Sequence, residues 1–162
     1  MSFELELCSE LQAPADRVWA QVSTLEGVNR ELGPWVRMSV PAALRGKHLG
    51  DAPVGDVAFT STLLALGLVP FDRHRLRLAE AGAGHFLERS SSLLQRVWEH
   101  ERWVEATRTG CRVRDRLWVD PRGAPDALVR AMVGALFRWR HRRLRQMFGE
   151  AAPSQNRPPS SQ

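Results

Sequence analysis

The chain contains no tyrosine, and Lys47 is the only lysine among its 23 basic residues. Arginine in place of lysine, together with abundant alanine, glycine and leucine, is typical of a GC-rich coding sequence. The formal net charge of +5 is therefore weak evidence for a nucleic-acid partner. No apolar run approaches the roughly 18 residues that a transmembrane helix needs, so we expect no stable membrane insertion.

Only two cysteines are present, Cys8 and Cys111. Alternation along the chain places Cys8 on a polar strand face and Cys111 on an apolar one, so a disulfide between them is not expected. The first residues, Met-Ser-Phe-Glu-Leu-Glu, lack the basic segment and apolar stretch of a signal peptide. We therefore expect a cytoplasmic protein with reduced thiols.

Motifs for metals and nucleotide cofactors are also missing. The histidines are scattered without the short spacings of zinc sites: His48, His74, His85, His100 and His141. There is no Gly-x-Gly-x-x-Gly sequence and no Walker loop. The run Ser90–Ser92 has no inferable neighbouring base and is explained as the polar edge of a strand. We expect no metal and no cofactor.

The composition that remains is that of an ordinary globular protein, with 43% hydrophobic and 25% charged residues in 162 positions. We expect one domain over residues 1–149. Residues 150–162 are rich in proline, serine, glutamine and asparagine, and we predict a disordered tail there.

The first third of the chain predicts a strand, two short helices and a second strand. Alternation from Phe3 to Leu11 indicates a half-buried strand. A helix opens at Pro14 and ends near residues 23–24, and Glu26 to Leu32 forms a second one, closed by Gly33-Pro34. Trp35 to Val40 is the next expected strand.

The rest of the chain predicts an antiparallel meander and then a long helix. Strands are expected over residues 57–66, 71–80, 85–92, 97–107 and 111–120. A helix follows from Pro125 to about Phe148. Its apolar stripe is predicted at Leu128, Met132, Ala135, Leu136 and Trp139, and its second half, residues 138–145, is strongly basic.

The hairpin of residues 96–120 carries charged side chains on its apolar face. With Thr109-Gly110 as the two-residue turn, the register pairs Ala106 with Val113, Val104 with Asp115, Arg102 with Leu117, and His100 with Val119. His100, Arg102 and Asp115 then face inward among valines and leucines, with Arg102 and Asp115 as diagonal neighbours.

Burial of this polar trio allows two interpretations, because such groups cost several kcal/mol unless they find partners or water. They form a structural ion pair beneath a packed core, or they line a cavity and orient a bound molecule. A second feature is equally open: the apolar segment Leu63–Phe71 is explained by core packing, by the lip of a cavity or by contact with a membrane.

The order of elements resembles the START-like helix-grip superfamily, also called SRPBCC. The resemblance covers residues 1–149 and lies in three segments: Ala13–Trp19 at the first helix, Asn29–Trp35 at the second helix and the following strand, and Trp98–Val104 on the histidine-bearing strand. Members often have a second histidine and a phenylalanine where Arg102 and Val104 stand here.

The resemblance implies an α+β fold in which a strongly curved antiparallel sheet of about seven strands wraps around the long C-terminal helix, with two short helices between strands 1 and 2. It also implies a cavity between the sheet and the C-terminal helix. Alternation and the helix stripe suggest these wall residues: Phe59, Ser61, Leu63, Trp98, His100, Arg102, Asp115, Leu117, Met132, Leu136 and Trp139.

The family holds both enzymes and binding proteins, so its fold alone does not decide the function. The leading hypothesis is binding or carriage of a small hydrophobic molecule, such as a lipid, a polyketide-like compound or an aromatic compound. The alternative is a cyclase or dehydratase of a polyketide-like substrate, with His100 as general base and Arg102 or Asp115 orienting it or the substrate. Nucleic-acid binding through the basic helix is disfavoured because its arginines surround the helix. A homodimer stays open.

Overall fold

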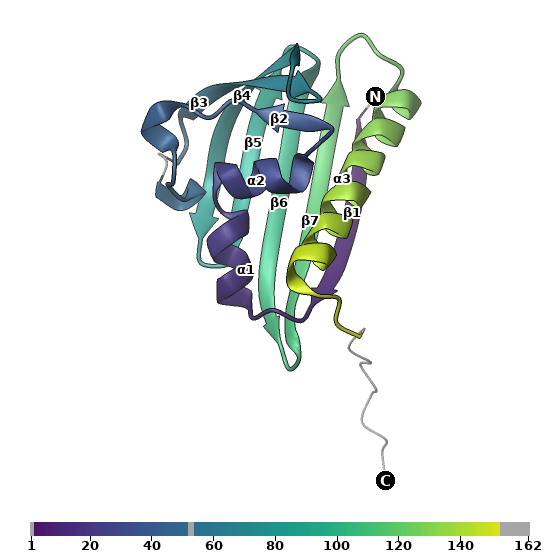
Figure 1. Ribbon diagram of the computed structural model, residues 1–162. Helices are drawn as coiled ribbons and strands as arrows, with labels where there is room; N and C mark the ends of the chain where they lie inside the picture. Colours follow the sequence, from purple (N-terminus) through teal and green to yellow (C-terminus); the bar gives the residue numbers. More distant parts are fainter. Residues whose placement is uncertain (1, 52–53, 153–162) are drawn as a thin grey trace.

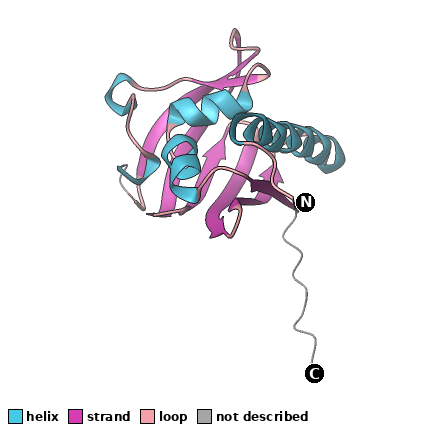
Figure 2. Ribbon diagram, turned by 60° about the horizontal axis from the view of Figure 1, so that its bottom comes forward, coloured by secondary structure: helices cyan, strands magenta, loops and turns pink. Residues whose placement is uncertain are grey.

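The computed structural model describes residues 2–51 and 54–152 and shows one seven-stranded antiparallel sheet with its helices on one face (Figures 1 and 2). The strand order is β1-β7-β6-β5-β4-β3-β2. The strands are β1 (Phe3–Leu11), β2 (Val36–Met38), β3 (Val57–Ala65), β4 (Val69–Gly82), β5 (His85–Ser92), β6 (Gln95–Thr107) and β7 (Gly110–Pro121). The helices are α1 (Ala15–Val22), α2 (Leu25–Leu32) and α3 (Asp126–Phe148), with 3₁₀ turns at Ala42–Leu44 and Leu49–Asp51. The predicted α+β helix-grip architecture is confirmed.

Local sequence explains how the helices begin and end. The side chain of Thr24 caps α2 by accepting a hydrogen bond from the backbone N–H of Gly27 at 3.0 Å. The long helix α3 ends at Gly149, whose φ of 76° is accessible to glycine without strain. The chain then returns to the sheet edge, where Glu150 forms a bridge with Leu11. Residues 150–152 of the predicted tail are described, and its remainder, residues 153–162, lies outside the described residues.

The hairpin of β6 and β7 is present, but the predicted register was wrong by two residues. Arg108 and Thr109 form the turn, so Thr107 pairs with Gly110 and Arg102 lies directly opposite Asp115. Because side chains alternate with a period of two, a shift by two residues keeps every side chain on its predicted face. His100, Arg102 and Asp115 are accordingly buried, as the alternation indicated.

The stripe predicted for α3 was also partly wrong. Leu128 and Met132 are 54% and 63% exposed, and Ala135 is exposed as well. The buried face instead carries Val133, Gly134, Phe137, Arg140, His141, Leu144 and Phe148. Gly134 on this buried face lies against β1, where a β-carbon at this position would be in ordinary van der Waals contact with Leu5 at 3.8 Å. The predicted stripe lies on the adjacent face of the helix, where Leu136 and Trp139 pack near α2 and β2.

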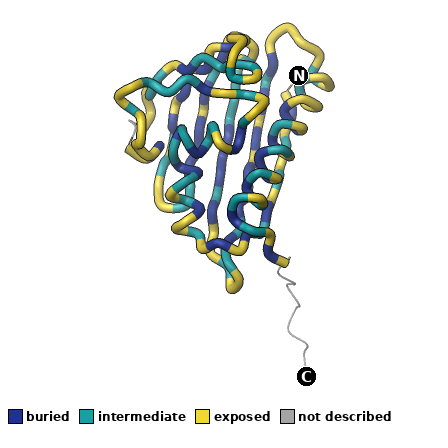
Figure 3. Tube along the Cα trace, in the orientation of Figure 1, coloured by how far each residue is buried: buried dark blue, intermediate teal, exposed yellow. Residues whose placement is uncertain are grey.

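Buried residues follow the strands and the sheet-facing sides of the helices (Figure 3), and the apolar ones form three clusters. One lies under α1 and the end of α3, and a second lies between β1, β7 and the first half of α3. The third, which we call the β3–β4 cluster, lies between these strands, α2 and the 3₁₀ turns, and consists of Leu25, Leu32, Met38, Leu49, Leu76, Leu78 and Phe86. Polar residues fill the space between the clusters.

Candidate functional site

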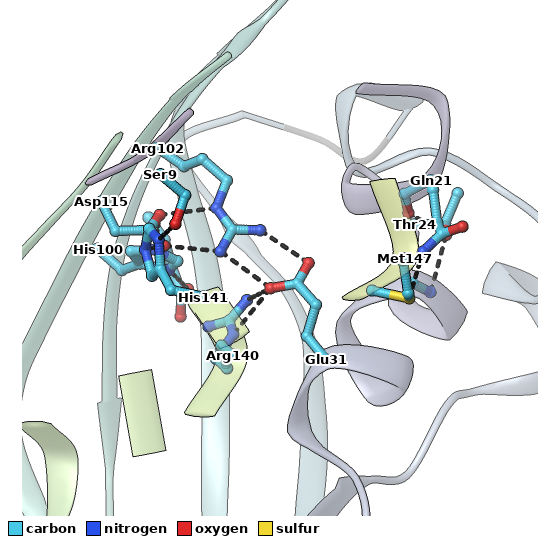
Figure 4. A network of polar contacts seen from close by, with 12 residues as sticks. Ser9, Gln21, Thr24, Glu31, His100, Arg102, Asp115, Arg140, His141 and Met147 are labelled. Atoms are coloured by element: carbon cyan, nitrogen blue, oxygen red, sulfur yellow. Dashed lines mark hydrogen bonds and ion pairs between the residues drawn. The ribbon is translucent and has the colours of Figure 1, made fainter. Parts of the chain in front are cut away.

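Arg102 of β6 is fully buried and bonded to two carboxylates (Figure 4). Its Nε and Nη2 donate to the two oxygens of Asp115, each at 2.7 Å. Its Nη1 and Nη2 donate to the two oxygens of Glu31, at 2.8 and 2.9 Å. Both contacts are bidentate, which is the strongest arrangement of a guanidinium with a carboxylate. Arg102 therefore joins the sheet to α2.

Asp115 of β7 sits directly across from Arg102 and uses all of its acceptor capacity. Besides the two bonds from Arg102, its Oδ1 lies 2.9 Å from Nε2 of His100 and its Oδ2 lies 3.0 Å from Nε2 of His141. A carboxylate has about four lone-pair positions, and all four are occupied. Since Asp115 can only accept, both histidines carry their proton on Nε2 in this arrangement.

The helices contribute the rest of the network. Arg140 of α3 donates through Nε to Glu31 at 3.0 Å, and its guanidinium lies 4.7 Å from the ring centre of Phe137. Nδ1 of His141 lies 2.8 Å from the hydroxyl of Ser9, which also accepts from Arg145 at 2.9 Å. Two buried carboxylates, Glu31 and Asp115, are thus matched by two buried guanidiniums, Arg102 and Arg140. Together with His100, His141 and Ser9, they come from β1, α2, β6, β7 and α3. We call these residues the Arg102 network.

A second polar pair lies beside the network on the concave face. His74 and Glu88 are 2.5 Å apart, and Nδ1 of His100 lies 3.9 Å from Glu88, beyond hydrogen-bonding distance. The ring of His100 is held edge-on between Phe86 and Phe137, with ring centres 5.1 and 5.2 Å away. His100 is therefore enclosed by aromatic rings and carboxylates.

Electrostatics keeps the carboxylates of both groups ionised. Burial raises the pKa of Glu31 and of Asp115, but the nearby guanidiniums outweigh it, so that each pKa lies below its usual value. Burial lowers the pKa of His100, only partly opposed by Asp115, so this imidazole is held neutral. Burial also lowers the pKa of His74, but Glu88 more than reverses the effect and the net shift is upward.

In this conformation the polar groups of the network bind one another. Nε2 of His100 is bonded to Asp115, so only Nδ1 could accept a proton from a substrate. Nδ1 faces Glu88, and Phe86 and Phe137 pack edge-on against the ring. Of the two interpretations of the polar trio, the ion-pair network describes the contacts that these three buried side chains make. Within residues 2–51 and 54–152, no group of His, Cys, Asp and Glu has the geometry to hold a metal ion.

The residues predicted as cavity walls lie in several different surroundings. His100, Arg102 and Asp115 come together in the network, with Leu117 fully buried behind them. Phe59, Leu63 and Leu136 are partly buried and pack on the β3–β4 cluster, whereas Trp98 packs beside Phe137. Ser61 is buried and bonded to the Ser39 carbonyl, Trp139 donates to the Gly33 carbonyl, and Met132 is exposed.

Sequence reasoning missed the helical half of the network, namely Glu31, Arg140 and His141. A signal was present on α3, where Val133, Phe137, Leu144 and Phe148 follow helical spacing and Arg140 and His141 fall in the middle of that face. The dense arginine content of residues 138–145 concealed it. The pair His74 and Glu88 was also missed, because it depends on the register between β4 and β5.

Two hollows lie outside the network. A crevice of about 10 Å³ beside the β3–β4 cluster is lined by Leu25, Leu44, Lys47, His48, Leu49 and Phe59. That volume is about what one water molecule requires. The other is an open surface hollow of about 360 Å³ at the end of α3, lined by Arg142, Arg145, Gln146 and Glu150.

Neither cysteine is paired, as expected: Cys8 is exposed and Cys111 is buried. Among the described helices, none combines the length and the apolar character needed to cross a bilayer.

Solved structures with a similar fold share little sequence with this chain. Protein CV1439 from Chromobacterium violaceum superposes with a TM-score of 0.68 at 16% identity, covering 92% of this chain and 99% of its own. A START superfamily protein from Mycobacterium smegmatis gives 0.63 at 11% identity, with coverages of 91% and 96%. Ara h 8.0201 gives 0.53 at 13% identity, with coverages of 90% and 98%.

Comparison with curated proteins finds no match. A family model described as a domain of unknown function, DUF8410, matches residues 9–148. The matched segment runs from Ser9, near the end of β1, to the last residue of α3 and includes every member of the Arg102 network. The chain therefore belongs to the DUF8410 family, and its fold is that of the START-like helix-grip superfamily.

Proposed function

We propose that the chain binds a small, mostly apolar molecule against the β3–β4 cluster. The observation that carries this proposal is the incomplete burial of that cluster. Many of the apolar side chains packed on it remain partly accessible: Trp19, Val28, Val36, Val40, Leu44, Ala58, Phe59, Leu63 and Leu136. Three of them, Phe59, Leu63 and Leu136, belong to the cavity wall suggested by the sequence.

Residues 41–51 cover this cluster and are joined to α1 and α2 by few hydrogen bonds. The backbone N–H of Leu49 donates to the Ser23 carbonyl at 2.6 Å, and the Ser23 hydroxyl lies 2.7 Å from Nδ1 of His48. Gly46 N–H donates to Glu26 at 3.1 Å. Outward movement of residues 41–51 would withdraw Leu49 from the β3–β4 cluster and enlarge the crevice, while the pairing of β3 with β4 from Phe59 to Leu63 would be kept. Segments with few buried contacts open at low free-energy cost.

The lining also suggests the ligand's chemistry. Four of the six crevice residues are apolar, and the others, Lys47 and His48, lie at its exposed side. An apolar body would displace water from Leu25, Leu44 and Phe59, and an acidic or polar end would reach the Lys47 ammonium. The Arg102 network takes no direct part. Its role is to hold α2 and α3 at fixed positions beside the site.

The test is titration of the full chain with N-phenyl-1-naphthylamine, an uncharged apolar fluorophore that brightens in apolar surroundings. Phe59→Ala enlarges the crevice, and we expect saturable binding that is at least about threefold tighter than that of the unaltered protein, because apolar cavities created by truncation accept apolar ligands. The matched control is Leu7→Ala, which truncates a partly buried side chain of a different cluster.

Absence of saturable binding in both the unaltered chain and Phe59→Ala would overturn the proposal, as would an equal effect of Leu7→Ala. Native mass spectrometry of protein purified from cells gives an independent measurement. A copurified lipid or aromatic acid whose occupancy changes in Phe59→Ala is the expected result.

A further inference from the structure

One end of the molecule gathers large apolar side chains on the surface. The turn between β3 and β4 exposes Leu66, Leu68, Val69 and Phe71, and Leu68 reaches 80% exposure. Trp35 before β2 is 54% exposed, and Leu93 and Leu94 in the turn between β5 and β6 are 65% and 46% exposed. Consecutive large apolar residues at a turn are unusual, because a folding chain gains nothing from leaving them in water. We call these seven residues the apolar end.

Hydrogen bonds join the three segments of the apolar end. Leu66 N–H donates to the Trp35 carbonyl at 2.8 Å, which joins the first two segments. The carboxylate of Asp72, next to Phe71, accepts from Leu93 N–H at 3.0 Å, which joins the third. The upper end of the ribbon shows the turn between β3 and β4 beside β2 (Figure 1). The segments that carry the apolar side chains are thus held beside one another at this end of the sheet.

Arginines surround the apolar end. Arg37 packs beside Gly67 of the turn, Arg73 is the second residue after Phe71, and Arg122 donates its backbone N–H to the Leu94 carbonyl. All three are exposed, and none forms an ion pair with another described residue. Two nearby carboxylates already have partners. Asp72 is buried and accepts hydrogen bonds from backbone N–H groups, and Asp120 forms an ion pair with Arg96.

We infer that the apolar end is a peripheral docking surface for an anionic lipid bilayer. Leucine, valine and phenylalanine would enter the interfacial region, and Trp35 would lie at the headgroup level that tryptophan favours. The unpaired arginines would face acidic headgroups. A second copy of this chain fits less well, because a twofold contact would bring the same unpaired arginines together.

The docking surface is independent of the proposed ligand site, since none of its seven residues lines the crevice. The test is cosedimentation of the full chain with vesicles of phosphatidylcholine alone and with about one third phosphatidylglycerol. We expect binding to the anionic vesicles only, weakened at least about tenfold when the salt concentration rises from about 0.05 M to about 0.5 M.

Variants distinguish docking through the apolar end from nonspecific attraction of a basic protein to anionic vesicles. Leu68→Ser and Arg73→Gln should each weaken binding at least about threefold, because the first removes inserted apolar surface and the second removes one cation near the headgroups. Arg77→Gln is the matched control. It lies on the same exposed face of β4, about 13 Å further from the turn at 3.3 Å per residue, and should bind as the unaltered chain does. Tryptophan emission should shift to the blue on anionic vesicles, and Trp35→Phe should remove most of that shift.

Equal binding by Leu68→Ser and the unaltered chain would overturn the inference, as would equal losses in Arg73→Gln and Arg77→Gln. A concentration-dependent dimer that Leu68→Ser abolishes, without vesicle binding, would assign the surface to a second copy and also overturn it. Circular dichroism of each variant confirms that the fold is retained.

Discussion

Replacing Glu31 with glutamine tests the charge balance of the Arg102 network. Glu31 is fully buried and accepts bonds from Arg102 and Arg140. Glutamine keeps the shape but removes the negative charge, and its amide nitrogen turns a donor toward guanidinium donors. Arg102 retains Asp115, whereas Arg140, only 4% exposed, loses the carboxylate that its guanidinium contacts.

The expected cost follows from that unpaired cation. Removing one partner of a buried ion pair destabilises a protein by about 3–5 kcal/mol. With a urea dependence of about 2 kcal/mol per molar, the midpoint of unfolding should fall by about 2 M. Urea titration at pH 7, followed by circular dichroism, measures this change.

A second substitution should recover much of the loss. Arg140→Met alone leaves Glu31 and Asp115 with only Arg102, so it too unbalances the buried charge. Glu31→Gln with Arg140→Met leaves the neutral pair of Arg102 and Asp115, and its cost should be at least about 2 kcal/mol smaller than the sum of the single costs. Additivity within about 0.5 kcal/mol, or a cost below about 1 kcal/mol for Glu31→Gln, would refute the reasoning.

Three further outcomes are expected. Because the folded-state pKa of His74 is raised above its usual 6.5, the stability lost in His74→Gln should be largest below that pH and should shrink as pH rises through the raised pKa; urea midpoints across that range check the sign. Gly110→Ala should lower the melting temperature markedly, since φ is 151° and a β-carbon would lie 2.0 Å from the Leu11 carbonyl oxygen, whereas Gly50→Ala, with open space around it, should change stability by less than about 0.5 kcal/mol. Leu66→Asn should stabilise the chain by about 0.5–1 kcal/mol, because Leu66 holds a φ of 52° that asparagine tolerates better; an unchanged or lower melting temperature would contradict this.

Prediction from sequence was accurate where a local period decides the outcome. The inward faces of β1 and β6 follow from alternation, and β5 spans the predicted residues His85–Ser92. The register of the β6–β7 hairpin was wrong because two adjacent turns, at residues 108–109 and 109–110, satisfy the same local pattern. The structure selects the one that places Arg102 opposite Asp115.

The stripe on α3 shows a different limit. Leu128, Met132, Leu136 and Trp139 have the spacing of a buried face, yet the helix buries the neighbouring face. Its rotation is decided by partners distant in sequence: the contacts of Phe137 with Trp98 and His100, and the bonds from Arg140 and His141 to Glu31 and Asp115. None of these is visible in a window of one helix.

The sequence by itself determined the order of elements and the burial of His100, Arg102 and Asp115, because periodicity and turn residues act over a few positions. The helix-grip class followed from the resemblance that this order of elements bears to a known superfamily. Only the tertiary structure decided what these polar groups do. Glu31 lies 71 residues from Arg102 in the chain, and Arg140 lies a further 38 residues beyond Arg102. A buried charge is satisfied by whichever group the fold brings within about 3 Å, and long-range packing sets that proximity.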